Sequence, residues 1–261
     1  MTLNITIALM EQVGDLAKKA GLAIMDIYET DFEVEHKSDS SPVTEADRIA
    51  EAIIIEGIRE GITAQFPIVG EEAFAAGHAP EVGSEPFWLV DALDGTKSFI
   101  SKSHEFTVNI ALIENGAPVM GVVHTPALGN TYWGGPAGAF AEMKGEPAKN
   151  ISCRVPADDG LVVVASRNHR TPELESFISD LNVKDSTSAG SSLKFCLVAS
   201  GHADIYPRLG RTMEWDTGAG HAVVVAAGGS VNKLDGTPLR YGKVGFANPD
   251  FIVRGLEATS S

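Results

Sequence analysis

The first sixty residues have the apolar spacing of two helices. From Leu9 to Tyr28, apolar side chains recur every three or four positions, which predicts an amphipathic helix. The stretch 36–43 is polar and is expected to be a loop. Thr44 then has the character of an N-cap residue, so a second helix is predicted to begin there and to stop near Gly61.

The next part of the chain has the pattern of buried strands. A short apolar run, 68–70, is expected to end a strand, and the apolar run PFWLVD predicts a strand that ends at Asp91. Two further apolar runs, 106–113 and 118–125, flank a Glu-Asn-Gly turn at 114–116. This arrangement predicts a β-hairpin.

The second half of the chain alternates strands and helices. The pattern predicts strands at 161–166 and 203–207, and helices at 172–181, 191–201 and 215–229. We therefore expect a layered α+β or α/β protein. A soft division near residue 150 separates an N-terminal α+β half, 1–150, from a C-terminal α/β half, 151–261, and the two are expected to form one compact unit.

Composition and charge narrow the classes of function. The chain has 261 residues, enough for one large domain or two packed halves, and a formal net charge of −15. This charge argues against binding nucleic acid through a broad basic surface. A small anionic substrate remains compatible, because bound divalent cations can invert the local field.

The sequence also gives an expected location. No apolar run resembles a transmembrane helix, and the N-terminus lacks the basic region of a signal peptide. Cys153 and Cys196 lie far apart and form no metal or redox motif. Such cysteine usage favours a reducing compartment, so the cytoplasm is expected. The oligomeric state is not readable, because apolar helical stripes serve cores and dimer interfaces alike.

The segment Asp91-Ala92-Leu93-Asp94-Gly95-Thr96 carries the sharpest chemical signal. Two carboxylates three positions apart in a tight turn can converge on hard cations, and Mg²⁺ prefers such oxygen ligands. Gly95 lets the backbone approach an anion closely, while Thr96 offers a hydroxyl and an N–H. The ordinary alternative is an Asp-rich turn.

Three further acids are candidates, and each has an ordinary alternative. Glu71 follows the apolar run 68–70 but could belong to a solvated Glu-Glu pair. Asp216 opens a predicted helix, where a negative charge is favoured by the helix dipole. Asp47 lies three residues after Thr44, which fits a capping box.

Taken together, these motifs resemble one family. The segments SPVTEAD, GEE, DALDGTKSF and WDTGAGHAVV, in this order over nearly the whole chain, resemble the lithium-sensitive inositol monophosphatase superfamily of magnesium phosphatases. The resemblance implies a layered α-β-α-β-α sandwich of the inositol monophosphatase and fructose-1,6-bisphosphatase type. Inhibition by lithium is likewise implied by the resemblance. Ala92 stands where the motif usually has proline, a departure that removes no ligand.

The resemblance also implies roles for individual residues. It implies two or three Mg²⁺ ions held by five ligands: the side chains of Glu71, Asp91, Asp94 and Asp216 and the carbonyl of Leu93. It further implies that Asp47 and the Thr96 hydroxyl together orient or activate a metal-bound water. Most of these ligands would come from the N-terminal half, and Asp216 from the C-terminal half.

Within the superfamily, the chain most resembles the 3′(2′),5′-bisphosphate nucleotidases of bacterial sulfur assimilation. The residues that carry this resemblance are 36–47, 105–113, 166–169, 190–201 and 206–208. It implies removal of the 3′-phosphate of adenosine 3′,5′-bisphosphate, which gives AMP and phosphate.

Such a substrate needs a second anion site and a surface for its base. The candidate donors to the second phosphate are Ser191, Ser192, Lys194 and Arg208. His169 is a candidate to pack against the adenine, and Gly95, Thr96 and Asp216 are expected to contact the reacting phosphate. In the ordinary reading, the two serines cap a helix, Lys194 is a solvated charge and Arg208 pairs with a surface acid. Arg211 and Glu214 are less usual in the family's pattern, so the sequence does not predict the fine shape of the substrate pocket.

Two other functions remain open. An inositol monophosphatase or a broader sugar-phosphate phosphatase would share the metal centre but would not need the second anion site. A non-catalytic protein that binds metal or nucleotide would not need the pair formed by Asp47 and Thr96.

Overall fold

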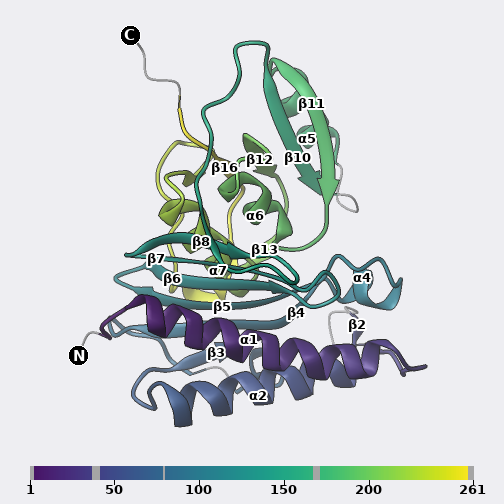
Figure 1. Cartoon of the computed structure of the whole chain (residues 1–261), viewed down its shortest axis with the longest axis vertical. Coiled ribbons are helices and arrows are strands. Elements are labelled where there is room, and N and C mark those ends of the chain that lie inside the picture. The colour runs from purple at the N-terminus through teal and green to yellow at the C-terminus, as the bar shows by residue number, and fades with distance from the viewer. Residues whose placement is uncertain (1–2, 37–41, 79, 167–170, 258–261) are drawn as a thin grey trace.

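Two β-sheets and three groups of helices form five alternating layers (Figure 1). The structure, a computed structural model, describes residues 3–36, 42–78, 80–166 and 171–257. From one end, the layers are helices α1 and α2, a seven-stranded sheet, helices α6 and α7, a five-stranded sheet, and helix α5. This is the α-β-α-β-α order predicted from the sequence.

The outer layer at one end consists of α1 (Ile7–Tyr28) and α2 (Glu45–Gly61). Both helices bury an apolar stripe against each other and against one face of the seven-stranded sheet. The hydroxyl of Thr6 accepts a hydrogen bond from the N–H of Leu9 and caps α1. Two short strands, β1 (Glu35–His36) and β2 (Pro42–Val43), pair in the region predicted to be a loop.

The seven-stranded sheet follows the order of the chain. Its strands are β3 (Ile68–Gly70), β4 (Phe87–Asp94), β5 (Thr107–Glu114), β6 (Ala117–Thr125), β7 (Asn130–Gly135), β8 (Gly138–Glu142) and β9 (Lys149–Ile151). Among the described residues of this sheet, β3 and β4 pair in parallel and all other neighbouring strands are antiparallel. The predicted hairpin is β5–β6. Two short helices, α3 (Glu71–Ala75) and α4 (Thr96–Ile100), follow β3 and β4.

The prediction that the strand would end at Asp91 is wrong. Strand β4 continues to Asp94, but its register against β5 shifts on the way. Asp91 pairs with Asn109 and Asp94 pairs with Thr107, so three steps on β4 face two on β5. This mismatch is a β-bulge, which bends the strand locally. The two carboxylates therefore lie on a bulge within a paired strand and not in a free turn.

Helix α7 (Glu214–Ala226) lies between the two sheets and is buried on most of its surface. Small residues let it pack closely: a Cβ on Gly121 of β6 would lie 2.4 Å from the carbonyl oxygen of Ala219. Helix α6 (Leu193–Ala199) packs beside it. The larger apolar core forms around these two helices.

The five-stranded sheet has the order β11-β10-β12-β16-β14. Its strands are β10 (Leu161–Ser166), β11 (Val183–Ala189), β12 (Ile205–Arg208), β14 (Ser230–Lys233) and β16 (Phe251–Arg254). Helix α5 (Pro172–Ser179) covers its outer face through Phe177 and Ile178. Beside the sheet, β13 (Thr212–Met213) pairs with β15 (Ala247–Asn248), and a 3₁₀ turn, Val244–Phe246, precedes β15.

The boundary between the sheets lies between Ile151 and Leu161, while α7 of the C-terminal half covers the first sheet. Whether 1–150 and 151–261 behave as separate halves stays a prediction. Across the described ranges, no helix combines the length and apolar character needed to cross a membrane.

Candidate active site

Three carboxylates from different elements converge where the first sheet meets α7. Oxygens of Glu71, at the start of α3, Asp91, on β4, and Asp216, in the first turn of α7, all lie within 4.8 Å of one another. Asp91 is buried and the other two are partly buried. Because all three donors are carboxylate oxygens, the cluster suits a hard cation such as Mg²⁺.

The bulge of β4 brings two more oxygen donors to the same region. Asp94 lines the same cavity as Glu71 and Asp216, and its Oδ2 accepts a hydrogen bond from the Thr107 hydroxyl at 3.4 Å. The carbonyl oxygen of Leu93 lies 3.4 Å from the Thr96 hydroxyl. Asp94 thus borders the acidic cluster, and Leu93 lies between the two acids of the bulge.

The electrostatics of the cluster favour a bound cation. Burial raises the pKa of Asp91 well above its usual range, and the charges of Glu71 and Asp94 raise it further. Burial and the charges of Asp94 and Glu71 likewise raise the pKa of Asp216. Buried like charges oppose each other's ionisation, so the cluster calls for protons or for cations to balance it. The donor set and the charge balance therefore both fit a divalent metal ion.

Asp47 and Thr96, the predicted catalytic pair, are in contact. The Thr96 hydroxyl donates to Oδ1 of Asp47 at 3.2 Å. The other oxygen of Asp47 accepts from the backbone N–H and the hydroxyl of Thr44, each at 2.7 Å. Asp47 therefore caps α2 and also contacts Thr96, the first residue of α4.

Gly95 joins the bulge to α4 in a conformation that favours glycine. Its φ is +94°, and a Cβ there would lie 2.1 Å from Oγ of Ser191. Any larger side chain would therefore meet both backbone strain and a steric clash.

The hydroxyls of Ser191 and Ser192 tie α6 to the acidic elements. The Ser191 hydroxyl lies within donating distance of the carbonyls of Asp94, 2.8 Å away, and Glu105, 3.1 Å away. The Ser192 hydroxyl lies 2.8 Å from the carbonyl oxygen of Asp216. Each serine has a single hydroxyl proton, and these protein carbonyls can accept it. The contacts therefore join the start of α6 to the bulge and to α7. Their contact with a substrate phosphate stays a prediction.

Lys194 is buried in the wall of the cavity, so its interpretation as a solvated charge is wrong. Its side chain is 5% exposed, and its ammonium group donates to the carbonyl of Ser191 at 2.6 Å. The same group lies 5.2 Å from the ring centroid of Tyr206. Burial lowers the pKa of Lys194 to about 8, although the nearby Asp94 carboxylate acts in the opposite direction.

Arg208, at the end of β12, lines the same cavity. One of its terminal nitrogens donates to the carbonyl of Arg211 at 3.1 Å. Its Nε is buried without a hydrogen-bond partner in the described part of the chain. A buried donor of this kind calls for an acceptor, such as a ligand or water.

A single cavity of about 310 Å³ joins the acidic and the cationic groups. Its lining includes Glu71, Asp94, Thr96, Asp216, Lys194 and Arg208. Phe195 and Tyr206 add aromatic surface beside the cations. His169, predicted to pack against a base, lies outside the described residues.

A sequence model of the inositol monophosphatase family matches residues 9–258. The chain belongs to the inositol monophosphatase family. The resemblance noted in the sequence is thereby confirmed.

Known members of the family differ in their similarity to the chain. CysQ of Bacteroides thetaiotaomicron, whose crystal structure is described as that of a bacterial family member, is 40% identical with a TM-score of 0.80, over 95% of this chain and 97% of that one. A curated 3′(2′),5′-bisphosphate nucleotidase CysQ of Salmonella typhimurium is 46% identical over 94% of this chain and 99% of its own length. A Thermotoga maritima IMPase is 26% identical with a TM-score of 0.77, over 95% and 92%.

The sequence did not single out a buried acid that supports the site of this inositol monophosphatase family member. Glu51, one turn after Asp47 on α2, is 5% exposed and accepts hydrogen bonds from the first turn of α3. A signal was present, because a glutamate at i+4 from Asp47 lies on the same helix face within an otherwise apolar stretch.

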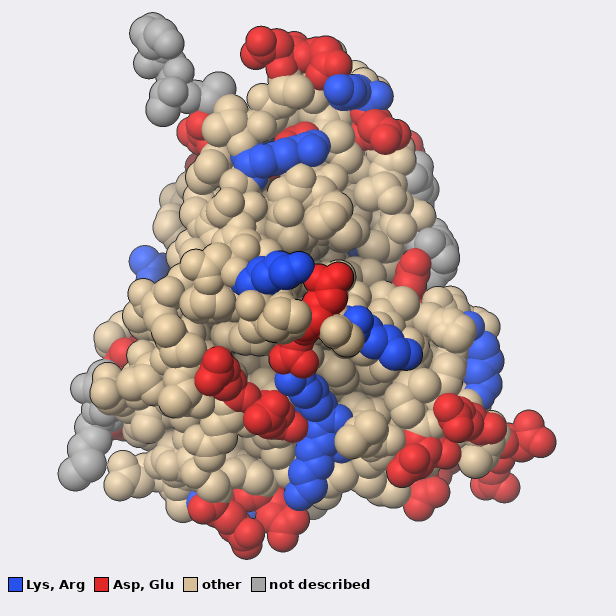
Figure 2. All heavy atoms as spheres, in the orientation of Figure 1, with Lys and Arg blue, Asp and Glu red and all other residues tan. Residues whose placement is uncertain are grey.

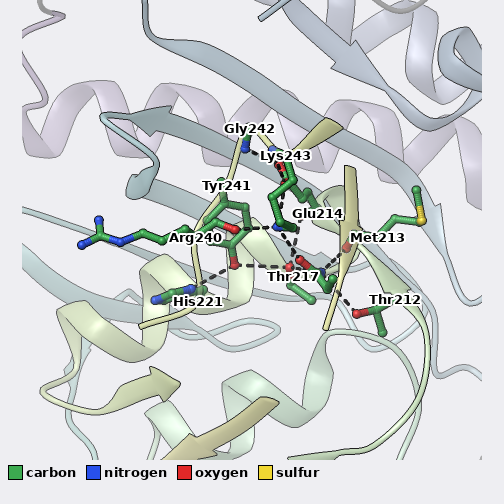
Figure 3. Close-up of polar contacts among 10 residues, drawn as sticks. Thr212, Met213, Glu214, Thr217, His221, Arg240, Tyr241, Gly242 and Lys243 are labelled. Carbon is green, nitrogen blue, oxygen red and sulfur yellow. Dashed lines mark hydrogen bonds and ion pairs between the residues drawn. The ribbon is translucent and has the colours of Figure 1, made fainter. Parts of the chain in front are cut away.

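A second missed feature is the polar network at the start of α7 (Figure 3). Glu214 is fully buried, and its carboxylate accepts from the backbone N–H groups of Gly242 at 2.7 Å and Lys243 at 2.9 Å. The Lys243 ammonium lies 2.6 Å from the same carboxylate. Thr217 extends the network by donating to the Glu214 carbonyl and accepting from Tyr241. These contacts fix the first turn of α7, which carries Asp216.

Charged side chains of both signs are mixed on the surface of the molecule. On the face shown in Figure 2, lysines and arginines stand singly or in small groups among acidic side chains and wide uncharged areas. The expected absence of nucleic-acid binding stays a prediction.

Proposed function

We propose that this family member is a 3′(2′),5′-bisphosphate nucleotidase that removes the 3′-phosphate of adenosine 3′,5′-bisphosphate. The observation that carries the proposal is one cavity whose lining combines the acids Glu71, Asp94 and Asp216 with two cations, the buried Lys194 and the half-buried Arg208. A monophosphate ester would use only the acidic side. Curated relatives named for this activity match nearly the whole chain at up to 46% identity, which supports the same assignment.

We propose Mg²⁺ as the cation, in two or three positions. Glu71, Asp91, Asp94, Asp216 and the Leu93 carbonyl would hold it, because they offer only oxygen atoms and the four carboxylates repel one another. When bound, Mg²⁺ supplies positive charge against the phosphate and makes a water molecule more acidic.

Asp47 and Thr96 would orient the attacking water. Because the Thr96 hydroxyl donates its hydrogen to Asp47 Oδ1, its oxygen is free to accept a hydrogen from water. Oδ2 of Asp47 is held by two hydrogen bonds from Thr44, so the carboxylate cannot turn away. As the water oxygen bonds to phosphorus, its proton would pass to Thr96 Oγ while the Thr96 hydroxyl proton passes to Asp47 Oδ1. The bond from phosphorus to O3′ would break, and O3′ would leave as a hydroxyl after taking a proton from solvent.

Lys194 and Arg208 would bind the 5′-phosphate. Only two carbonyls accept from the Lys194 ammonium among the described residues, which leaves one of its three hydrogens for a ligand. The unsatisfied Nε of Arg208 offers a second donor. A phosphate placed there would favour the charged form of Lys194, whose pKa burial lowers to about 8.

The test is phosphate release from adenosine 3′,5′-bisphosphate and from inositol 1-phosphate, measured side by side with and without Mg²⁺. We expect Mg²⁺-dependent turnover with a strong preference for the nucleotide. The Asp47→Asn variant should lose roughly 10²-fold or more of kcat with an unchanged circular dichroism spectrum, because proton transfer is impaired. Lys194→Met should raise KM for the nucleotide far more than for inositol 1-phosphate.

The other outcomes are equally informative. A preference for inositol 1-phosphate would agree with the proposed metal centre and would contradict the proposed substrate. Mg²⁺ binding without turnover of either ester would favour a binding protein. Near wild-type turnover in Asp47→Asn would remove Asp47 from catalysis.

We also propose that the enzyme works in the cytoplasm on a free small molecule. Both cysteines are buried free thiols, which is consistent with a reducing compartment.

A further inference from the structure

Glu51 is a buried acid outside the predicted metal and catalytic sets. It lies four residues after Asp47 on α2, so both side chains project from the same face of that helix. Its two carboxylate oxygens accept from the backbone N–H of Glu72 at 2.8 Å and of Ala73 at 2.9 Å. These amides belong to the first turn of α3, which begins with Glu71.

Helix α3 depends on this contact because it has no cap of its own. It has five residues, and its N-cap is Gly70, which offers no side chain. The first N–H groups of a helix lack intrahelical partners, and Glu51 supplies acceptors for two of them from another element. Gly70 makes the approach possible, since a Cβ there would lie 2.5 Å from the carboxyl carbon of Glu51.

The charge of Glu51 makes a purely local capping role costly. Its carboxylate is buried one helical turn from Asp47 and against the first turn of the helix that begins with Glu71, and burying such a group is costly unless it is hydrogen-bonded. A five-residue helix at a surface could be capped by a neutral serine or threonine on its own chain. The carboxylate instead links α2 rigidly to the residue next to Glu71.

We propose that Glu51 is a positioning residue that sets the Glu71 carboxylate for cation binding. Helix α2 would then place two parts of the site at once, Thr96 through Asp47 and Glu71 through Glu51. This inference rests on the proposed metal dependence. Position 70 is then glycine because a side chain there would occupy the space of the Glu51 carboxylate.

The test uses Glu51→Gln, which keeps the size of the side chain but leaves one carbonyl oxygen for two N–H groups. We expect the dissociation constant for Mg²⁺, measured by calorimetry without substrate, to rise about 10- to 100-fold, as for other residues that orient metal ligands. In the phosphate-release assay, the half-saturating Mg²⁺ concentration should rise in parallel, while kcat at saturating Mg²⁺ falls much less. Gly70→Ala should show the same shift by displacing the carboxylate.

Asp204→Asn is the matched control. Asp204 is also buried and accepts a backbone N–H, that of Val162 at 2.7 Å, but it pairs with Arg154 and does not line the cavity. Its variant should lower the melting temperature and leave Mg²⁺ affinity unchanged. If Glu51→Gln and Gly70→Ala also lower only the melting temperature, Glu51 is structural and the inference is overturned. If the wild-type protein binds no Mg²⁺, the proposed function fails first.

Discussion

At the scale of single residues, Gly95 shows how tightly the site is built. It has a left-handed backbone, and it leaves room for the Ser191 hydroxyl, which lies within donating distance of the Asp94 and Glu105 carbonyls. The missing side chain at Gly95 therefore matters both for the backbone after Asp94 and for the position of Ser191 before α6.

We expect Gly95→Ala to lower the free energy of unfolding by about 2–4 kcal/mol, because backbone strain and a steric clash add. Gly77→Ala is the control, since Gly77 has φ +79° but no atom lies within 4 Å of the position that its added methyl group would take. Its loss should be only about 1 kcal/mol. Urea unfolding measures both, and equal losses would show that the contact with Ser191 carries no weight.

The convergence of the acids was predictable from the sequence only through their combination. Asp91 and Asp94 are close in the chain, but Glu71 and Asp216 are far from each other, and no spacing rule brings them together. The resemblance of four motifs, taken in their order, to one family supplied that information. The burial of Lys194 was not predictable, because the side of α6 that faces the cavity depends on how the helix packs between the sheets.

At the scale of elements, α1 packs against the seven-stranded sheet, and it contacts a buried histidine there. A Cβ on Gly21 of α1 would lie 2.7 Å from the ring of His124 on β6. Nδ1 of that ring is 2.9 Å from the Thr131 hydroxyl of β7. Burial lowers the pKa of His124 to about 4, so the ring is neutral in the folded protein at neutral pH.

This contact predicts a loss of stability in mild acid. The unfolded chain takes up a proton on His124 below pH about 6.5, and the folded protein does so only near pH 4, so stability falls between these values. At pH 5 the loss from His124 should be about 1–2 kcal/mol. Urea unfolding at pH 7 and pH 5 measures it. His124→Gln should show a shallower dependence, whereas the exposed His202→Gln should match the wild type. Identical slopes in all three would contradict the prediction.

The elements that the sequence predicted best are those with a buried stripe. Helices α1 and α2 and the β5–β6 hairpin carry regular apolar spacing and clear ends. Strand β11 was not predicted, because its sequence VKDSTSA is mostly polar and exposed at a sheet edge. Such a strand is held by its pairing with β10 and leaves no apolar pattern to read.

At the scale of the whole molecule, metal binding should contribute to stability. The raised pKa values of Asp91 and Asp216 mean that the metal-free fold binds protons more tightly than the unfolded chain does. Their contribution is therefore present at low pH and lost as pH rises through the folded-state pKa values. Bound Mg²⁺ should reverse that loss.

We expect Mg²⁺ at 100 times the dissociation constant measured at pH 7.5 to stabilise the protein by about 2.7 kcal/mol at that pH relative to protein in chelator. The same Mg²⁺ concentration should give a smaller gain at pH 5.5, because protons then compete for the carboxylates. Melting curves at both pH values measure the effect. Sodium chloride at the same ionic strength is the control, because the net charge of −15 alone makes any salt somewhat stabilising. Equal gains from the two salts would argue against a specific cation site.

The position of α7 has a consequence for the order of synthesis. All seven strands of the first sheet have been made once Ile151 is added, but the helix that covers their inner face is complete only at Ala226. For about 75 residues of translation, on the order of 4–15 s at ribosomal rates, that face has no cover from its own chain. The growing polypeptide is then most open to aggregation and to capture by chaperones. Asp216 arrives on the same helix, so sealing of the core and completion of the acidic cluster occur together.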